Sequence, residues 1–248
     1  MTDSVLVTVA IPVGPYAVYK KWLAECLASV QAQTLPPSEV LLIDDMANVM
    51  LGDLGEFADE LYWGSVRPEF GVLLKHGKPL GRIWRAPWRL GDLGAFNCGV
   101  GLADNDLVFL LSCDDMIRPD CLELCVAEWE KNQRKDAYYY VGAHYIGNEW
   151  PDQTVPFGNA MVTKGLWRLT GGLPIEAASG AGDQAHISII MVNFPDRLIP
   201  VEGGKPLYDY RVHNETVTSR LGAWCGAVEE TRKVILSTWK PPEWGRMA

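Results

Sequence analysis

The chain has 248 residues, of which 48% are hydrophobic and 21% charged, which excludes a disordered or fibrous protein and favours one large globular domain over two small ones. The formal net charge of −9 argues against a broad surface for nucleic acid phosphates, although a local basic patch is compatible with it. The sequence has no apolar run of about 18 residues and begins without the basic and apolar regions of a secretion signal, so we expect a soluble, cytoplasmic protein.

The beginning of the chain predicts a strand, a helix and a second strand. Residues 5–13 (VLVTVAIPV) form a β-rich run that ends in proline and glycine. Apolar residues recur at helical spacing over 16–33, and 39–43 is the next predicted strand. A strand, a helix and a strand in close succession form the building block of a parallel sheet.

The alternation of strands and helices continues further along the chain, after a less regular stretch over 46–79 with a weak helical signal over 51–62. The later patterns predict a strand near 82–84, a helix over 95–103, a strand over 107–111, a helix over 119–131, an aromatic strand over 137–145 and a helix over 227–239. We therefore expect an α/β fold with a mostly parallel central sheet flanked by helices, and a second half of α+β type.

The six cysteines lie mostly in apolar stretches and lack the paired CxxC spacing of a zinc site. Cys121 and Cys125 are four residues apart on one predicted helix, which is typical of core packing. The sequence therefore predicts buried free thiols and no structural metal.

Two pairs of aspartates follow predicted strands. Asp44 and Asp45 end the second strand, and Asp114 and Asp115 follow the strand that precedes the helix over 119–131. Ligands of α/β sheets bind at the carboxyl ends of strands, and paired carboxylates there suit a hard divalent cation that also contacts substrate phosphates. The structural alternatives are an Asx turn at the first pair and, at the second, a solvated loop with Asp120 capping the next helix.

Five segments, in order, resemble the family 2 glycosyltransferases. They are AIPVGPY with LAECLASVQAQTLPPSEVLLIDD, then GDLGAFNCG, LLSCDDMIRPDCLE, LTGGLPIEAASGAGD and YRVHNETVTS. The first resembles the family's opening strand, proline turn, helix and Asp-Asp strand end. The others resemble its glycine-rich segment ending in Ala-Arg-Asn-x-Gly, its Asp-x-Asp strand end, its Gly-Gly segment before an acidic pair and its late Tyr-Arg-x-His element. Each motif is weak alone, and their shared order makes the resemblance specific.

The resemblance implies a GT-A fold in which residues 1–221 form a single domain. Within it, 1–118 would form the half that binds the nucleotide sugar, and 119–221 the half that carries the acceptor and catalytic groups. Residues 222–248 would form a C-terminal helical extension.

The C-terminal extension contains Trp224, Trp239 and Trp244. Tryptophan carries a large apolar area, so core packing is favoured, with an acceptor groove or a subunit contact as alternatives. No basic amphipathic helix in this segment supports membrane association.

The resemblance also implies Mn²⁺ or Mg²⁺ as cofactor and a nucleotide sugar, in the first instance a UDP-sugar, as donor. Asp114 matches the second Asp of the Asp-x-Asp motif, and with Asp115 and His213 it is expected to hold the metal. The donor is expected to contact Pro12, Asp44, Asp45, Asn97, Asp114, Arg89 and Arg211. Of these, the two acids of the second strand match positions that hold the uracil or the ribose in the family.

Displacing a nucleoside diphosphate from a sugar requires a cation for the leaving phosphates and a carboxylate for the acceptor proton. Asp183 matches the second member of the family's acidic pair and is the predicted general base. Asp183 also suits the N-cap of a helix over 187–192, and the two roles are compatible.

The chain departs from the family pattern at three positions. Ser112 replaces the first Asp of the Asp-x-Asp motif, which leaves the metal with one carboxylate fewer. Phe96 replaces the Arg of Ala-Arg-Asn, so that a phosphate or base contact would come from elsewhere, with Arg85 and Arg89 nearby in sequence. Gly182 replaces the first member of the acidic pair, and this bears on the donor preference.

The sequence therefore predicts an inverting glycosyltransferase. One alternative is a catalytically impaired sugar-nucleotide or glycan-binding protein, for which Ser112 and Gly182 are the motivating changes. Another is a sugar-phosphate nucleotidyltransferase, which the segment over 12–16 disfavours because it is not a basic, glycine-rich phosphate loop. A polysaccharide, a lipid-linked sugar, a protein side chain and a modified nucleic acid base are all compatible acceptors. The oligomeric state is left open.

Overall fold

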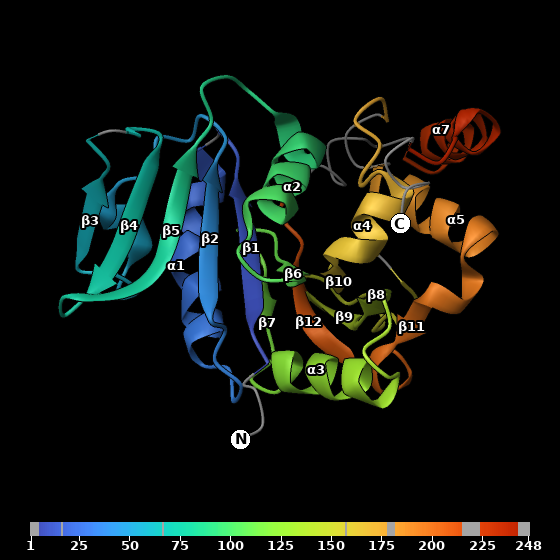
Figure 1. The fold of residues 1–248 in the computed structure, drawn as a ribbon, viewed down its shortest axis with the longest axis horizontal. Helices are drawn as coiled ribbons and strands as arrows, with labels where there is room; N and C mark the ends of the chain where they lie inside the picture. Colours follow the sequence, from blue (N-terminus) through green and yellow to red (C-terminus); the bar gives the residue numbers. More distant parts are fainter. Residues whose placement is uncertain are drawn as a thin grey trace.

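The computed structural model describes residues 5–15, 17–65, 67–156, 158–177, 182–214 and 224–242. Within these ranges a nine-stranded sheet has the order β11-β8-β10-β6-β1-β2-β5-β4-β3. Figure 1 shows this sheet from β3 at the left edge to β11 on the right. Helices cover both of its faces, which confirms the expected α/β architecture.

The centre of the sheet is parallel, as the strand and helix pattern predicts. It consists of β6 (Leu107–Leu110), β1 (Val7–Val13), β2 (Glu39–Asp44) and β5 (Lys78–Arg85). Every residue of β1, β2 and β6 is buried, since helices lie on both faces. The carboxyl ends of these strands therefore meet at one edge, where the predicted aspartates lie.

Antiparallel strands extend the sheet on both sides. They are β3 (Glu60–Trp63) and β4 (Phe70–Lys75) beside β5, and β10 (Ala160–Thr163), β8 (Tyr138–Tyr140) and β11 (Leu198–Pro200) beyond β6, of which β11 runs parallel to β8. The weak helical signal over 51–62 corresponds to only one 3-10 turn, η1 (Leu51–Leu54), followed by β3. The irregular stretch is thus a short turn and an edge hairpin, which have no helical periodicity to detect.

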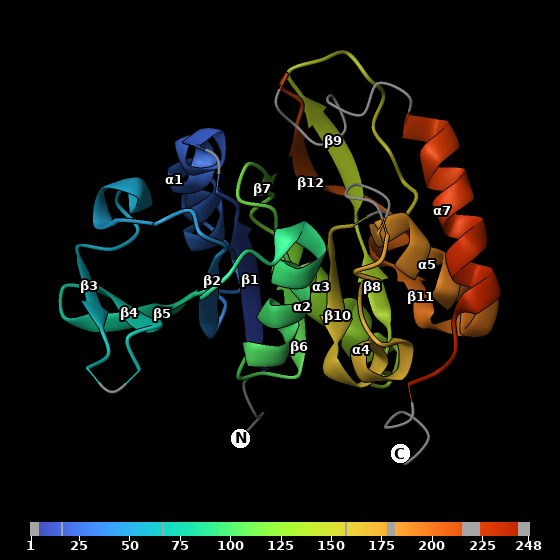
Figure 2. The same cartoon turned by 90° about the horizontal axis from the view of Figure 1, so that it is seen from above.

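The sheet lies between two groups of helices, and each group packs on it through its own hydrophobic cluster. One face is covered by α1 (Ala17–Gln31) and α3 (Cys121–Lys131), and the other by α2 (Gly91–Leu102), α4 (Lys164–Thr170) and α5 (Gly182–Asn193). The C-terminal helix α7 (Trp224–Thr238) lies along α5, as Figure 2 shows. Two further 3-10 turns, η2 (Pro195–Arg197) and η3 (Val201–Gly203), flank β11. None of the described helices is long and apolar enough to cross a membrane.

The aromatic strand expected over 137–145 is two strands in two different sheets, so this prediction is wrong in detail. The chain leaves β8 after Tyr140 and enters β9 (Gly142–Ile146), which pairs with β12 (Pro206–Arg211), itself paired with β7 (Met116–Ile117). At Gly142 a Cβ atom would lie only 2.2 Å from the carbonyl oxygen of Gly204, so the crossing needs glycine. The small sheet brings β12 against the turn that follows β6.

The cysteines agree with the sequence-based expectation. Among the described residues Cys26, Cys98, Cys113, Cys121 and Cys125 are free thiols, and all but Cys98 are buried. Burial raises the pKa of Cys121 well above its usual value, which keeps the thiol neutral and inert.

Candidate active site

The acidic turn after β6 begins where the pairing of β1 and β6 ends. The last register pair is Ala10 with Leu110, and the N–H of Leu111 donates to the carbonyl of Ala10 at 3.1 Å. Pro12, further along the same edge of β1, has no N–H to continue the ladder. The chain after Leu111 therefore turns away from the sheet, and the N–H of Asp115 closes the turn on the carbonyl of Ser112 at 3.2 Å.

Asp115 is buried and ties this turn to β12. Its carboxylate accepts hydrogen bonds from the hydroxyl of Tyr208 and from the backbone N–H of Arg211, both at 2.7 Å. Burial and the neighbouring Asp114 raise the pKa of Asp115 well above its usual value, while these two hydrogen bonds oppose the shift. Both oxygens have protein donors, so the geometry gives Asp115 a positioning role. Its role as a metal ligand stays a prediction.

Asp114 and His213 converge from distant parts of the chain. Oδ2 of Asp114 lies 3.2 Å from Nε2 of His213, although the residues are 99 positions apart in sequence. Their side chains are 13% and 15% exposed, so both are reachable from the solvent. The predicted association of these two residues is therefore present in the structure.

The donor set at Asp114 and His213 fits a cation that takes its other ligands from substrate. No group of three or more potential metal-binding side chains occurs among the described residues. Mg²⁺ commonly uses one or two carboxylates together with substrate phosphates and water, and imidazole suits Mn²⁺ as well. One carboxylate and one imidazole match this mode of binding. They are too few to coordinate the cation without ligands from the substrate and water.

Arg211 is held beside this pair from three directions. Its Nε donates to the carbonyl of Asp114 at 2.9 Å, and its Nη2 donates to Glu25 at 2.7 Å. The guanidinium lies 3.9 Å from the ring centroid of Trp22, a cation–π distance. The sequence analysis did not identify Trp22, because it belongs to the apolar stripe of α1 and resembles an ordinary core residue. Glu25 was also missed, because its contact with the distant Arg211 depends on the tertiary structure.

Asp44 is fully buried and organises the loop after β2. Its carboxylate accepts hydrogen bonds from the N–H groups of Asn48 and Val49, at 2.9 and 3.0 Å, and from Nε of Arg85 at 2.9 Å. Met46 and Asn48 adopt φ values of 61° and 54°, a left-handed conformation that these bonds support. The predicted contact of Asp44 with uracil or ribose is not tested by this geometry.

Asp45 binds the beginning of α2. Its two oxygens accept hydrogen bonds from the N–H groups of Leu90 and Gly91, at 2.6 and 3.0 Å. These donors carry the positive end of the helix dipole, which favours a carboxylate there. The segment over 86–90, with exposed Arg89, is thereby fixed above the strand ends.

Asn97 connects the glycine-rich helix α2 with the Gly-Gly segment. Its amide donates to the carbonyl of Leu173 at 2.8 Å and accepts from the N–H of Leu173 at 2.9 Å. Gly172 has a φ of 77°, and a Cβ there would lie 2.4 Å from Oδ1 of Asn97. Asn97 therefore positions the segment that leads to the predicted base.

Asp183 lies in the first turn of α5 with a pKa suited to proton transfer. Burial raises the pKa of Asp183 to about 6, backbone N–H donors at Gln184 and Gly158 lower it, and Asp92 adds a further increase. A general base is most effective when its pKa lies near the operating pH. Asp92 and Gly158 were missed by sequence reasoning, because their proximity to Asp183 depends on tertiary structure.

Gly182, which replaces the first member of the acidic pair, packs closely against α2. A Cβ at Gly182 would lie 2.4 Å from both Cδ atoms of Leu93. A side chain at position 182 therefore requires the Leu93 side chain of α2 to move.

Residues 72–172 match the sequence model of glycosyl transferase family 2. The resemblance to family 2 is confirmed. The matched part contains Asn97, Asp114 and Asp115, and Asp183 and His213 lie beyond it. No curated protein matches the sequence.

Solved structures of TarS from S. aureus are similar to this chain in fold. One TarS structure is 15% identical with a TM-score of 0.66, and the match covers 96% of this chain and 41% of TarS. TarS 1-349 in complex with UDP-GlcNAc is 14% identical with a TM-score of 0.68, covering 94% of this chain and 66% of that one. TarS 1-349 in complex with UDP is 14% identical with a TM-score of 0.62, covering 96% and 68%. This chain thus spans about two fifths of the longest of these chains, and the likeness establishes the GT-A fold.

Beneath Asp183 in this GT-A fold, the core contains a buried histidine. Nε2 of His186 lies 2.8 Å from the hydroxyl of Thr170, and the rings of Trp167 and Tyr138 pack edge to face against it. Burial lowers the pKa of His186 to about 3, so it is neutral at physiological pH. His186 supports the first turns of α5.

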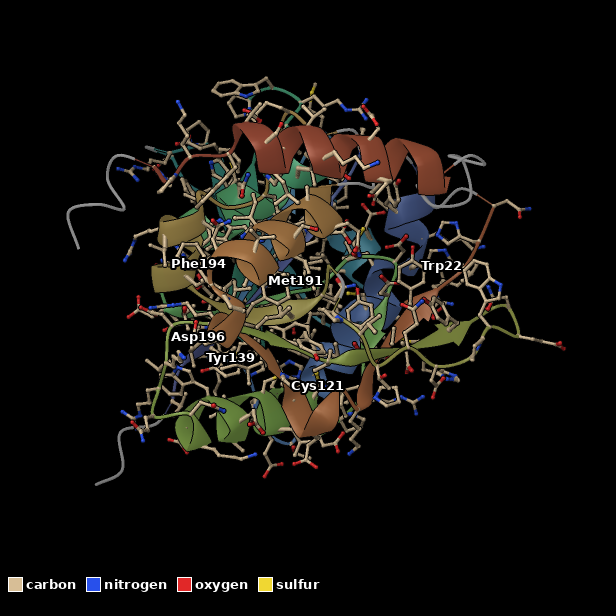
Figure 3. All side chains as sticks on the ribbon, turned by 90° about the vertical axis from the view of Figure 1, so that its right-hand side faces the viewer. Trp22, Cys121, Tyr139, Met191, Phe194 and Asp196 are labelled. Atoms are coloured by element: carbon tan, nitrogen blue, oxygen red, sulfur yellow. The ribbon has the colours of Figure 1, made fainter. Side chains whose placement is uncertain are left out.

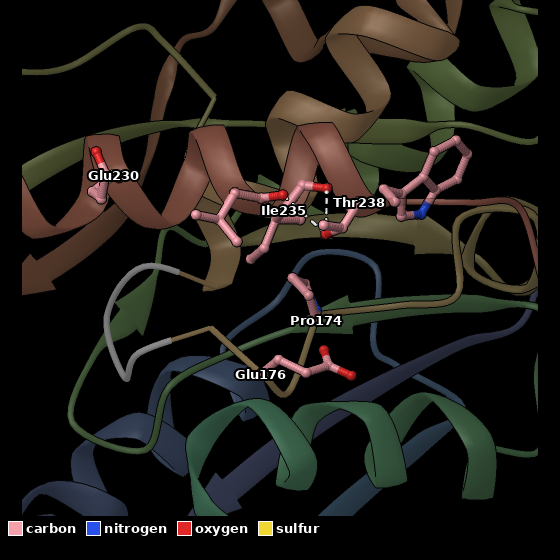
Figure 4. A pocket seen from close by; sticks show the side chains of 7 residues that line it. Pro174, Glu176, Glu230, Ile235 and Thr238 are labelled. Atoms are coloured by element: carbon pink, nitrogen blue, oxygen red, sulfur yellow. Dashed lines mark hydrogen bonds between the residues drawn. The ribbon is translucent and has the colours of Figure 1, made fainter.

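A groove of about 480 Å³ lies between the Gly-Gly segment and α7. It is lined by Pro174, Glu176, Glu230, Val234, Ile235, Thr238 and Trp239 (Figure 4). None of the predicted site residues lines it. Nε1 of Trp239 donates to the carbonyl of Thr170 at 3.1 Å, and its ring packs on Phe194, the residue that follows α5 and is labelled in Figure 3.

The expected core packing of the C-terminal tryptophans is therefore confirmed for Trp239. Trp244 lies outside the described residues, as do 178–181 and 215–219 of the family motifs, and only the backbone of Trp224 is described.

Proposed function

We propose that the protein is an inverting glycosyltransferase that moves a sugar from a nucleoside-diphosphate sugar to an acceptor hydroxyl. The observation that carries the proposal is the convergence of Asp114 and His213 at the strand ends of a family 2 fold. The TarS structures with UDP and UDP-GlcNAc support a UDP-sugar as the donor class.

In the proposed reaction, Asp183 accepts the proton of the acceptor hydroxyl. The acceptor oxygen forms a bond to the anomeric carbon as the bond from that carbon to the diphosphate oxygen breaks, so the configuration inverts without a covalent intermediate. Asp114 and His213 would hold Mn²⁺ or Mg²⁺, which neutralises the charge that develops on the leaving diphosphate. Asp115 and Arg211 keep the turn that carries Asp114 in place.

The same scheme assigns the donor side. Pro12, Asp44, Asp45, Asn97, Arg89 and Arg211 would surround the donor. Asp44 and Asp45 would act through the loop and the helix start that they hold, in addition to any direct contact with uracil or ribose. Arg85 and exposed Arg89, which are near Phe96 in sequence, are the candidates to replace the arginine lost there.

Release of free UDP tests the proposal. The purified protein is incubated with a panel of UDP-sugars, with Mn²⁺, with Mg²⁺ and with a chelator, and the released UDP is measured. Metal-dependent UDP release from at least one donor is expected. If no donor is turned over and none shifts the melting temperature, the proposal is wrong.

A second candidate is a sugar-nucleotide-binding protein without transferase activity. The observation in its favour is Ser112, which leaves a single carboxylate, Asp114, beside His213. Tight donor binding without UDP release across a broad acceptor panel would favour this candidate.

A further inference from the structure

Three aromatic side chains gather on the small sheet. Tyr145 of β9 and Tyr210 of β12 are register partners, and their ring centroids lie 5.6 Å apart at an interplanar angle of 69°. Trp150, in the loop after β9, packs edge to face on Tyr145 with a centroid distance of 5.3 Å. Trp150 is 53% exposed, so this cluster of Tyr145, Trp150 and Tyr210, the aromatic platform, keeps an accessible ring. Figure 2 shows β9 and β12 projecting from the body of the molecule.

The aromatic platform adjoins the turn that carries Asp114. Tyr208 and Tyr210 are two residues apart on β12 and therefore share one face of that strand, with about 7 Å between them at the usual rise per residue. Tyr208 donates to Asp115 at 2.7 Å, and the N–H of Arg211, the residue after Tyr210, donates to the same carboxylate at 2.7 Å. A ligand on the platform would thus extend toward the proposed metal and diphosphate region.

The loop that carries Trp150 also reaches the proposed base. Gln153 pairs with Ala143 of β9 through two backbone hydrogen bonds of 2.8 and 2.9 Å. Further along the same loop, the N–H of Gly158 donates to Asp183, and a Cβ at Gly158 would lie 3.1 Å from Oδ2 of Asp183. The loop therefore links the platform with the carboxylate that would deprotonate an acceptor.

The polar pair of this sheet lies on the other face of β9, because His144 and Tyr145 are consecutive residues of the strand and their side chains alternate. Nδ1 of His144 lies 2.8 Å from Oδ1 of Asp152, and their side chains are 44% and 47% exposed. Aromatic faces bind the C–H surfaces of pyranose rings, so the rings of the platform provide the fit to a sugar. An exposed carboxylate and a net charge of −9 disfavour a nucleic acid here.

We propose that the aromatic platform binds a saccharide chain and presents it as the acceptor. This inference rests on the proposed function and names the acceptor class of the same site. The sugar stacks on Trp150 and the exposed edges of the tyrosines, and its reactive end lies toward Asp183.

Calorimetric titration of the full chain with cellohexaose, chitohexaose and laminarihexaose tests the platform. At least one oligosaccharide is expected to bind, and Trp150→Ala is expected to weaken that binding at least about fivefold, since one stacked ring is lost. Tyr62→Ala is the matched control, because Tyr62 is 58% exposed on the edge strand β3. Absence of binding by all three, or equal binding by both variants, would overturn the proposal.

A second variant covers the case in which Trp150→Ala does not fold. Trp150→Phe retains an aromatic ring of smaller area and is expected to weaken binding of the same oligosaccharide about twofold to fivefold. Trp150-dependent binding of a single-stranded RNA in place of the oligosaccharides would contradict the saccharide class.

UDP release separates this inference from the proposed function. If UDP is released from a donor and Trp150→Ala leaves the KM of an oligosaccharide acceptor unchanged, the platform is wrong and the function stands. If oligosaccharides bind through Trp150 and no donor is turned over, saccharide binding by the platform stands, and the proposed transferase and the acceptor role are wrong.

Discussion

The two acidic strand ends of this protein use their carboxylates in opposite ways. At the end of β2, Asp44 and Asp45 are buried and their oxygens accept hydrogen bonds mainly from backbone N–H groups of nearby loops. After β6, Asp114 remains partly exposed and meets the imidazole of His213. The first pair therefore holds the backbone of neighbouring loops in place, and Asp114 after β6 remains able to bind a ligand. Sequence shows the same residue type in both, and only the surroundings distinguish scaffold from chemistry.

The largest expected effect is at the predicted base. Asp183→Asn removes the proton acceptor while retaining the hydrogen-bonding shape, so UDP-sugar-dependent transfer should fall about 10²- to 10⁴-fold. The Kd of UDP, measured by calorimetry with Mn²⁺ present, should be unchanged. Loss of UDP binding would instead assign Asp183 to the donor site. Asp92→Asn is the matched control, and its effect on transfer should be much smaller.

The scaffold role of Asp44 predicts a loss of stability. Asp44→Asn turns one acceptor into a donor facing a backbone N–H or Arg85, and the free energy of unfolding should fall by about 3 kcal/mol. Asp114→Asn should change it by less than about 1 kcal/mol, because Asp114 is partly exposed and its partner is a single histidine. Urea unfolding of both variants measures the difference. Equal losses would contradict the comparison between the two strand ends.

The ligand capacity of Asp114 and His213 predicts a shared effect on metal. Asp114→Asn and His213→Ala should each weaken Mn²⁺-dependent UDP binding about 10- to 100-fold, and the double variant should lose little more because the two residues act as a unit. Calorimetric titration of UDP with and without Mn²⁺ provides the measurement. If the losses of UDP affinity in the two single variants add fully in the double variant, Asp114 and His213 act independently.

The pKa of Asp183 predicts the pH dependence of both activity and stability. The general base must be ionised, so kcat/KM should fall about tenfold per pH unit below about 6 and level off above it. Because the folded-state pKa is raised, the folded protein holds this proton more tightly than the unfolded chain does. The contribution of Asp183 to stability is therefore present at acid pH and is lost as the pH rises from about 4 to about 6. Asp183→Asn should remove this loss and raise the Tm at pH 7.

The smallest expected effect concerns the support of Arg211. Trp22→Leu keeps an apolar side chain in α1 and removes the cation–π contact, so the KM of the donor should rise about threefold to fivefold while kcat changes little. Arg211→Lys should have a similar effect, because lysine cannot bridge Asp114, Glu25 and the indole ring together. A purely structural role of Trp22 would lower the Tm and leave the donor KM unchanged.

The sequence was most informative where structure is local. Hydrophobic runs and turn residues located β1, α1, β2, β6 and α3 to within a few residues, because periodicity and buried strands reflect neighbouring positions. The edge hairpin β3–β4 and the division of 137–145 between two sheets escaped prediction. These depend on strand partners and on the close approach of Gly142 to Gly204.

In the candidate site, too, some features could be predicted from the sequence and others depend on tertiary contacts. The resemblance of five ordered motifs to family 2 glycosyltransferases placed Asp114, Asp115, Asp183 and His213 in one predicted site. Only the tertiary structure decided that Asp115 binds Tyr208 and the backbone of Arg211, while Asp114 faces His213. The physical reason is that the parallel β9–β12 pair and the antiparallel β7–β12 pair are long-range contacts with no local signature. Burial then determines which carboxylate is occupied by the protein and which one remains able to bind a ligand.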